Sequence, residues 1–138
     1  MRYYLSLGSN LGEREQHIRQ AILRIEQLIG PVSRCSSLYY SEPWGFRSEH
    51  EFCNVCCLLE TDKQPHEVLA ATQTIERELG RKEKSHDGCY TDRTIDIDII
   101  RAFDNAEKEI SIDTAELHIP HPLWQQRDFV KIPLNEIR

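Results

Sequence analysis

The sequence predicts a single domain of mixed helices and strands, in which the order strand, helix, strand occurs twice. Residues 2–7, 52–59 and 94–100 have strand patterns of hydrophobicity, whereas residues 13–29 and 65–79 have helical ones. A chain of 138 residues is long enough for one hydrophobic core and short for two. We therefore expect one domain over residues 1–138.

The first strand alternates, with Tyr3, Leu5 and Leu7 on one face, and residues 8–12 then form a turn. The turn leads into the first helix, whose apolar positions recur every three or four residues: Ile18, Ala21, Ile22, Ile25, Leu28 and Ile29. The turn lacks the glycine spacing of the common nucleotide-binding loops. A plain connection between strand and helix is therefore its better interpretation.

Residues 32–40 predict a second strand, and residues 41–49 predict a loop that contains two large aromatic side chains. Trp44 and Phe46 have two equally weighted interpretations. They cap the edge of the core, or they close over a flat ligand and exclude water.

The continuous apolar run at residues 52–59 predicts a buried strand, on which Phe52 and Asn54 share one face. A buried amide is more often satisfied by nearby backbone than by a ligand, but beside a ring it could also read the edge of a ligand. Cys53 and Cys56 lie at an odd spacing, which puts them on opposite faces of the strand. They cannot converge on one metal ion.

The second helix begins near Pro65, ends at Gly80 and turns four residues inward: Val68, Thr72, Ile75 and Leu79. Gln73 and Glu76 share another face of this helix. By default these two are solvated polar side chains, and a ligand role is the minority interpretation.

Acid and isoleucine alternate strictly from residue 95 to residue 99. On a strand, the three isoleucines point into one layer, and Asp96 and Asp98 project from the other with their stems roughly 6 to 7 Å apart. Two such carboxylates can bind hard cations. The alternative is the solvated face of an edge strand with Arg93 as counter-ion, which is the more common explanation for such a stretch alone.

Residues 81–89 are polar and locally basic, and they lead directly to Arg93 and the two aspartates. A solvated run of charge is the usual explanation. The same arrangement would suit a polyphosphate with bound magnesium.

After a break at residues 102–105, residues 110–112 predict a short strand in a hairpin, and residues 123–129 predict a short helix. Prolines make residues 118–122 extended. His118 and His121 therefore lack the helical setting of zinc-enzyme motifs, and zinc is not favoured.

The net charge of −6 argues against general binding of nucleic acid. The sequence has neither a secretion signal nor an 18-residue apolar run, so we expect a cytoplasmic protein that does not enter membranes. The odd number of cysteines does not fit a disulfide framework and indicates mostly buried thiols: Cys35, Cys53, Cys56, Cys57 and Cys89.

Taken in order, these motifs resemble the 6-hydroxymethyl-7,8-dihydropterin pyrophosphokinase family over nearly the whole chain. The segments that carry the resemblance are Gly8-Ser9-Asn10-Leu11, Pro43-Trp44-Gly45, Phe52-Cys53-Asn54, Gln73-Thr74-Ile75-Glu76, Gly80-Arg81, residues 93–99, Pro120-His121, Arg127 and Phe129. The resemblance implies an α+β fold. Its ferredoxin-like core would have a mostly antiparallel sheet, with extra strands and with helices packed in an α-β-α arrangement.

The resemblance also implies transfer of the diphosphate of ATP to a pterin alcohol, with in-line attack and loss of AMP. Asp96 and Asp98 would hold two magnesium ions and would be catalytic together with Arg81 and Arg93. The implied pterin contacts are Ser41, Pro43, Trp44, Phe52, Asn54 and Phe129. The implied ATP contacts are Gln73, Glu76, Arg81, Lys84, Arg93, His121 and Arg127.

Some residues depart from the family pattern: Tyr90-Thr91-Asp92 before Arg93, Phe52 for a common tyrosine, Glu116, His118 and a short tail. Two other functions stay open. A non-catalytic module could bind a pterin or nucleotide, and a metal-dependent phosphohydrolase could use the same aspartates. We expect a monomer that takes small-molecule substrates.

Overall fold

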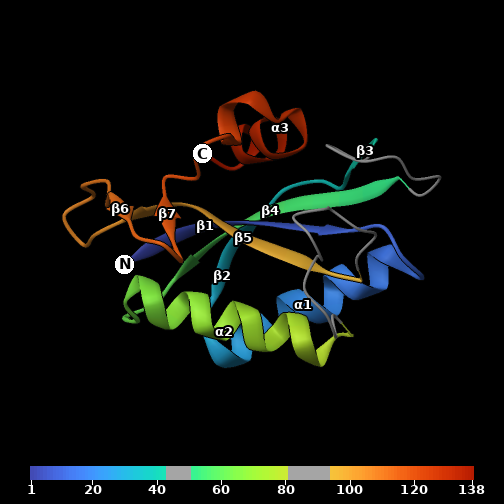
Figure 1. Ribbon diagram of the computed structural model, residues 1–138, viewed down its shortest axis with the longest axis horizontal. Coiled ribbons are helices and arrows are strands. Elements are labelled where there is room, and N and C mark those ends of the chain that lie inside the picture. The colour runs from blue at the N-terminus through green and yellow to red at the C-terminus, as the bar shows by residue number, and fades with distance from the viewer. Residues whose placement is uncertain (43–50, 81–93) are drawn as a thin grey trace.

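A five-stranded antiparallel sheet lies between helices in the computed structural model, which describes residues 1–42, 51–80 and 94–138 (Figure 1). Helices α1 (Arg14–Leu28) and α2 (Pro65–Glu78) cover one face of the sheet. Helix α3 (Asp128–Glu136) covers part of the other face. The expected α+β fold with an α-β-α arrangement is confirmed.

The centre of the sheet is β1 (Arg2–Ser9), which pairs with β4 (Phe52–Glu60) on one side and with β5 (Asp96–Phe103) on the other. Both β2 (Val32–Cys35) and β3 (Tyr39–Ser41) pair with the far side of β4. A separate two-stranded sheet contains β6 (Ile112–Asp113) and β7 (His118–Ile119). Every pairing among the described strands is antiparallel, and the β1–β5 ladder shifts its register between Tyr4 and Leu5. Strand β1 thus brings residues from both halves of the chain side by side.

The single strand expected over residues 32–40 is wrong, because the chain leaves the sheet between β2 and β3. The Ser36 side chain explains the break. Its Oγ accepts a hydrogen bond of 2.9 Å from the Cys56 backbone N–H, and so takes the place of a backbone carbonyl. With that donor satisfied by a side chain, the backbone is free to turn away.

The short helix expected over residues 123–129 is also wrong in extent. Residues Trp124–Gln126 form one 3-10 turn, and α3 then runs on to Glu136 with Pro133 inside it. Val130, Leu134 and Ile137 bury one side of this segment against the sheet. This burial offsets the cost of a proline within a helix.

The hairpin expected after β5 is present, although β5 continues to Phe103 before the turn. The Asp104 N–H donates to the Lys108 carbonyl at 2.9 Å, and the Ile110 N–H donates to the Ala102 carbonyl at 2.9 Å. Residues 112–113 pair with β7 instead of β5. After this turn, the chain leaves the main sheet at β6 and pairs with β7.

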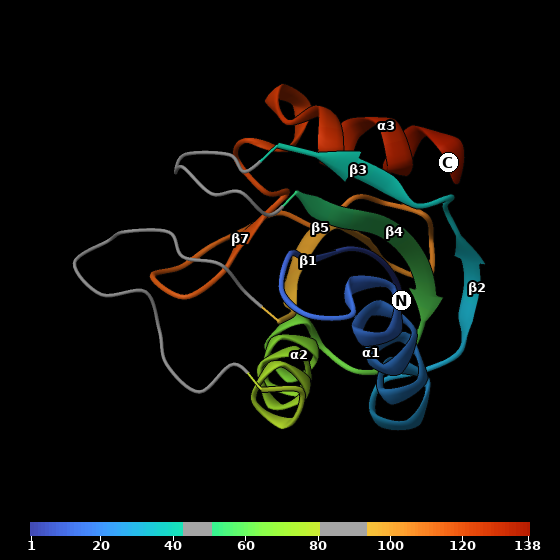
Figure 2. The same cartoon turned by 90° about the vertical axis from the view of Figure 1, so that its right-hand side faces the viewer.

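Two hydrophobic clusters lie on opposite faces of the sheet. The larger one fills the space beneath α1 and α2, and the smaller one lies beneath α3 (Figure 2). Cys53 belongs to the larger cluster and Cys56 to the smaller, so their expected placement on opposite faces is confirmed. Burial raises the pKa of Cys56 to about 12, which keeps this thiol protonated and apolar in character.

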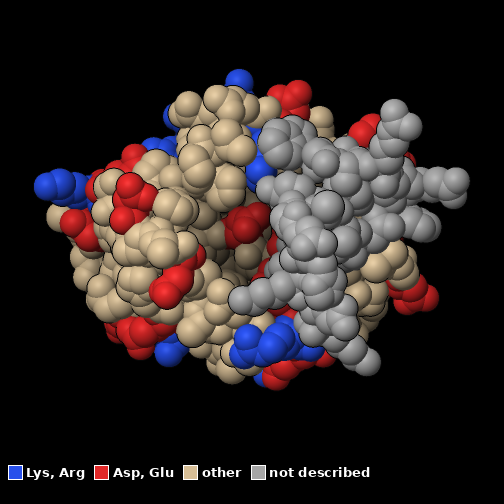
Figure 3. Space-filling model, in the orientation of Figure 1, with Lys and Arg blue, Asp and Glu red and all other residues tan. Residues whose placement is uncertain are grey.

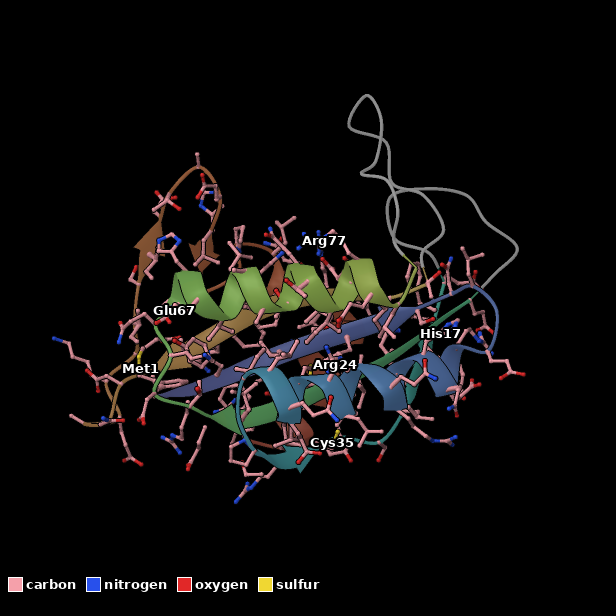
Figure 4. All side chains as sticks on the ribbon, turned by 90° about the horizontal axis from the view of Figure 1, so that it is seen from below. Met1, His17, Arg24, Cys35, Glu67 and Arg77 are labelled. Carbon is pink, nitrogen blue, oxygen red and sulfur yellow. The ribbon has the colours of Figure 1, made fainter. Side chains whose placement is uncertain are left out.

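Helices α1 and α2 lie side by side under the sheet (Figure 4). The Arg24 guanidinium on α1 reaches both carboxylate oxygens of Glu78 on α2, at 2.8 Å and 2.9 Å. No helix in the described part of the chain is long and apolar enough to cross a membrane.

Substitution at Ile25 should test the larger cluster, because this residue on α1 is fully buried whereas Leu23 on the same helix is 59% exposed. We expect Ile25→Ala to lower the free energy of unfolding by about 2–5 kcal/mol through lost burial and a residual cavity. The control Leu23→Ala should change it by no more than about 0.5 kcal/mol. Urea denaturation measures both, and equal losses would contradict the assigned orientation of α1.

Candidate active site

One row of three residues crosses the middle of the sheet. Gly8 on β1 is paired directly with Asp96 on β5 and with Asn54 on β4. Directly paired residues project from the same face, and two interstrand spacings separate Asp96 from Asn54 by about 10 Å. This is the face on which α3 packs, because the neighbouring residue Cys56 belongs to the cluster beneath α3.

The next row contains Asp98, Ser6 and Cys56. Asp96 and Asp98 are partly exposed, whereas Ile95, Ile97 and Ile99 are buried in the cluster beneath α1 and α2. The alternation therefore places the two aspartates on the partly exposed face of β5 and the three isoleucines in the core, as a period of two predicts. In Figure 3, acidic atoms lie deep in a hollow at the place where Figure 1 shows β5, the last strand in the order β2-β4-β1-β5.

The absence of a side chain at Gly8 lets Asn54 and Phe52 of β4 lie close to the β1 backbone. A Cβ atom at Gly8 would lie 3.1 Å from Asn54 Oδ1 and 3.4 Å from the Phe52 ring. The sequence places Gly8 in the turn after the first strand, whereas in the structure it belongs to β1. A glycine inside a strand often marks a place where a ligand approaches the backbone closely, and that signal could have identified it.

Asn54 is 2% exposed and uses its amide nitrogen within the protein. Nδ2 donates to the Tyr39 carbonyl at 3.0 Å and to Ser41 Oγ at 2.8 Å. The expectation that nearby backbone satisfies this amide is confirmed for its nitrogen. These bonds fix the amide plane and hold Ser41 beside Phe52, its partner in the β3–β4 ladder.

Helix α1 also holds the start of β4 and the end of β3. Arg14 Nη1 donates to the Glu51 carbonyl at 2.8 Å, and its guanidinium lies 5.2 Å from the centre of the Tyr40 ring. The Tyr40 hydroxyl donates to Glu15 Oε1 at 3.0 Å, and this hydrogen bond is the main cause that raises the pKa of Tyr40 to about 12. The neutral hydroxyl thus remains a donor to Glu15 at neutral pH.

Phe52 and Phe129 come from two different elements, β4 and α3. Phe52 lies beside Gly8 on β4, and Phe129 lies in the first turn of α3, where the Arg127 guanidinium is 5.9 Å from the centre of its ring. Both aromatic side chains therefore belong to the elements that border this face of the sheet. Stacking of the two rings on a ligand stays a prediction.

The default interpretation of Glu76 as a solvated side chain is wrong. Glu76 is 6% exposed, and its Oε2 accepts a hydrogen bond of 2.9 Å from the Ile97 backbone N–H. Gln73, on the preceding turn of α2, is exposed. Helical spacing alone gave no sign that one of this pair meets the edge of β5.

His121 is half-buried where β7 leads into the 3-10 turn. Its backbone N–H donates to the Ile100 carbonyl at 2.8 Å, and its Nδ1 accepts from the Leu123 N–H at 3.3 Å. Burial is the main cause that lowers its pKa below 6.5, the positive charges of Arg127 and His118 act in the same direction, and Asp96 opposes them. His121 is therefore neutral at pH 7 and carries its proton on Nε2, where it can donate to an anion.

The donor set fits magnesium that arrives with phosphates. Asp96 and Asp98 supply hard oxygen ligands on one face, and Mg²⁺ is commonly held by one or two carboxylates plus substrate phosphates and water. Within residues 1–42, 51–80 and 94–138, no three histidine, cysteine or acidic residues form a metal-binding group.

Five residues implied by the resemblance lie outside the part of the chain that the structure describes: Pro43, Trp44, Arg81, Lys84 and Arg93. The same holds for Cys89 and for Phe46, so the closing of Trp44 and Phe46 over a ligand stays a prediction. The structure does bring together Asp96, Asp98, Asn54, Phe52 and Ser41 on one face. His121 lies near this group, since both Asp96 and Arg127 influence its pKa.

The lowered pKa of His121 predicts a pH-dependent stability. The unfolded chain binds the proton more strongly than the folded one, so this stability is complete above about pH 6.5 and is lost as the pH falls. Replacement by asparagine, His121→Asn, should reduce the loss between pH 7.5 and pH 5 in urea denaturation. Identical pH dependence in the variant and the unaltered protein would contradict the assignment.

Comparison of the sequence with known proteins identifies one family. The family model described as 7,8-dihydro-6-hydroxymethylpterin-pyrophosphokinase (HPPK) matches residues 4–138. The protein named 2-amino-4-hydroxy-6-hydroxymethyldihydropteridine pyrophosphokinase from Porphyromonas gingivalis is 43% identical over 134 residues, which cover 97% of this chain and 88% of that protein. Its namesake from Bacillus subtilis is 39% identical over 135 residues, which cover 97% of this chain and 76% of that protein.

A solved structure supports the fold independently. The crystal structure of a Plasmodium falciparum HPPK-DHPS triple mutant with SDX-DHP has a TM-score of 0.70 and 16% identity. The match covers 98% of this chain and 40% of that chain, so it concerns only part of the larger protein. From the family model and the two close relatives, this chain belongs to the 6-hydroxymethyl-7,8-dihydropterin pyrophosphokinase family.

Proposed function

We propose that the protein transfers the diphosphate of ATP to the hydroxymethyl group of 6-hydroxymethyl-7,8-dihydropterin and releases AMP, a step of folate biosynthesis. Membership of the family over almost the whole chain supports this activity. The structural observation that carries it is the row of Asp96, Gly8 and Asn54. Its length of about 10 Å suits a metal-bound phosphate at one end and a flat heterocycle at the other.

The pterin end of the site is formed by Phe52 and Asn54, which both lie close to Gly8. Phe52 would stack on one side of the ring and Phe129 on the other, which suits a flat heterocycle. Asn54 would read the polar edge, with its amide plane fixed by Tyr39 and Ser41. Contacts of Pro43 and Trp44 with the pterin stay predictions from the sequence.

The ATP end is formed around Asp96 and Asp98. These carboxylates would hold magnesium, and the family resemblance implies two ions. Bound magnesium would neutralise phosphate charge and orient the diphosphate. Neutral His121 would donate from Nε2 to a phosphate oxygen, and the Arg127 guanidinium would bind by charge-assisted hydrogen bonds. Nucleotide contacts of Gln73, Glu76, Arg81, Lys84 and Arg93 stay predictions from the sequence.

In the reaction, the hydroxymethyl oxygen attacks the β-phosphorus in line as the bond from that phosphorus to the AMP oxygen breaks. AMP leaves with the electron pair of that bond, and the hydroxyl proton passes to solvent. The protein contributes position and charge more than covalent chemistry, as in phosphoryl transfer generally. We propose that it acts as a monomer in the cytoplasm, as its sequence predicts.

Product analysis separates this function from its two rivals. Protein, magnesium, ATP and 6-hydroxymethyl-7,8-dihydropterin are incubated, and phosphorus NMR identifies the products. AMP formed only when pterin is present supports the proposed transfer. Inorganic phosphate released without pterin would support the hydrolase, and binding without turnover would support the non-catalytic module.

Replacement of either aspartate should abolish turnover without unfolding the protein. We expect Asp96→Asn and Asp98→Asn each to lower kcat by about 100-fold or more, because each removes a charged ligand from the phosphate end. Their melting temperatures should change little, since both side chains face the hollow and not the core. The control Asp62→Asn removes an exposed carboxylate from the connection before α2 and should turn over normally. Near-normal rates in both site variants would remove the metal role.

A methyl group at Gly8 should obstruct the pterin more than ATP. Gly8→Ala would place an atom 3.1 Å from Asn54 Oδ1 and beside the Phe52 ring. We expect KM for the pterin to rise about tenfold or more, while binding of ATP in the absence of pterin stays near normal. Steady-state kinetics and isothermal titration measure the two effects. An equal loss for both ligands would indicate general distortion of the sheet.

A further inference from the structure

Glu76 is a buried carboxylate that meets the strand of the two aspartates from the opposite side of the sheet. It lies on α2, on the face away from the hollow, and is 6% exposed. Its Oε2 accepts a hydrogen bond of 2.9 Å from the Ile97 N–H, and Ile97 stands between Asp96 and Asp98 in the sequence. One side chain of α2 therefore holds the peptide unit between Asp96 and Ile97.

The position of β5 explains why this backbone group needs an acceptor from a helix. The strand order is β2-β4-β1-β5, so β5 has no strand beyond it along this path in the described part of the chain. Further along β5, the His121 N–H donates to the Ile100 carbonyl at 2.8 Å. A buried N–H without an acceptor is costly, and a carboxylate is the strongest acceptor that a side chain offers.

The same hydrogen bond determines how the two aspartates are presented. The Ile97 side chain is 5% exposed within the cluster beneath α1 and α2, so packing fixes one side of this residue. Glu76 fixes its N–H and therefore the orientation of the peptide between Asp96 and Ile97. A rotation of this peptide would change the directions in which Asp96 and Asp98 project, and metal ligands tolerate only small displacements.

We propose that Glu76 is a positioning residue for the metal site: through the Ile97 N–H, it sets the spacing and direction of Asp96 and Asp98. The inference rests on the proposed function, since it concerns the aspartates that bind magnesium with ATP. Groups that orient metal ligands commonly change metal affinity by about 10- to 100-fold when they are replaced. Direct contact of Glu76 with the nucleotide is the competing role.

Two variants of Glu76 distinguish the loss of its hydrogen bond to Ile97 from the loss of its negative charge. Glu76→Ala removes the acceptor and the charge together, whereas Glu76→Gln keeps an oxygen that can accept from Ile97 and removes only the charge. Glu78→Ala and Glu78→Gln are matched controls, because Glu78 lies two residues later on α2 and pairs with Arg24 at the surface of the helix pair. Circular dichroism confirms that each variant is folded.

Three measurements need neither pterin nor turnover. Amide hydrogen exchange by NMR reports the Ile97 N–H, with amides of β1 as the internal reference. Mn²⁺ titration of the ligand-free protein, followed by electron paramagnetic resonance, reports metal affinity. Binding of ATP in EDTA reports nucleotide contacts that do not involve metal. Failure of the product test would overturn the proposed function while these readouts still decide the role of Glu76.

For Glu76→Ala we expect the amide hydrogen of Ile97 to exchange at least about tenfold faster. Mn²⁺ affinity should fall about 10- to 100-fold, whereas the affinity for ATP without metal should stay within about twofold of normal. Glu76→Gln should keep Ile97 protected and Mn²⁺ affinity within about threefold, and the Glu78 variants should match the unaltered protein.

Unchanged Ile97 exchange or unchanged Mn²⁺ affinity in Glu76→Ala would overturn the proposal. Loss of metal-free ATP binding would assign Glu76 to the nucleotide instead. If Glu76→Ala does not fold, Glu76→Gln decides: retained Mn²⁺ affinity supports positioning, whereas a full loss with Ile97 still protected would assign the effect to charge.

Discussion

Direct pairing of Gly8 with both Asp96 and Asn54 is the constraint on which the rest of the site depends. It places residues from three distant parts of the chain on one face, at separations set by backbone hydrogen bonds. A slip of one residue in either ladder would send a whole set of side chains to the opposite face. Burial of the β5 isoleucines and of Tyr3, Leu5 and Leu7 in the cluster beneath α1 and α2 favours this register.

The two faces of the sheet have different roles: one packs the larger hydrophobic cluster, and the other carries the candidate active site. Helices α1 and α2 cover one face and fill the larger cluster, whereas α3 covers only part of the other and leaves the rows of Asp96 and Asp98 partly exposed. Burial of Ile95, Ile97 and Ile99 stabilises the strand and at the same time turns the two carboxylates outward. The packing that forms the core therefore also orients the two aspartates. Glu76 adds a second link, because its side chain on α2 binds the backbone of β5.

Patterns of period two and 3.6 predicted most of this architecture, because most apolar residues of β1, β4, β5, α1 and α2 are buried on the side that the period assigns to them. They predicted the shared face of the aspartates and the local satisfaction of Asn54. They could not predict contacts that cross the layers. The burial of Glu76 depends on where α2 meets the edge of β5, the break at Ser36 depends on a side chain that replaces a carbonyl, and α3 forms despite Pro133 because the sheet buries it.

The central claim is that one sheet face brings the metal-bound phosphates and the pterin alcohol together across about 10 Å. The most direct test is the distance from Mn²⁺ to a ¹³C-labelled hydroxymethyl carbon of the pterin, measured by paramagnetic relaxation with a non-hydrolysable ATP analogue that has a methylene bridge between its α- and β-phosphates. A separation within the length of the row, less than about 10 Å, is the predicted result. The absence of relaxation at that carbon, in a complex that binds both ligands, would contradict the account.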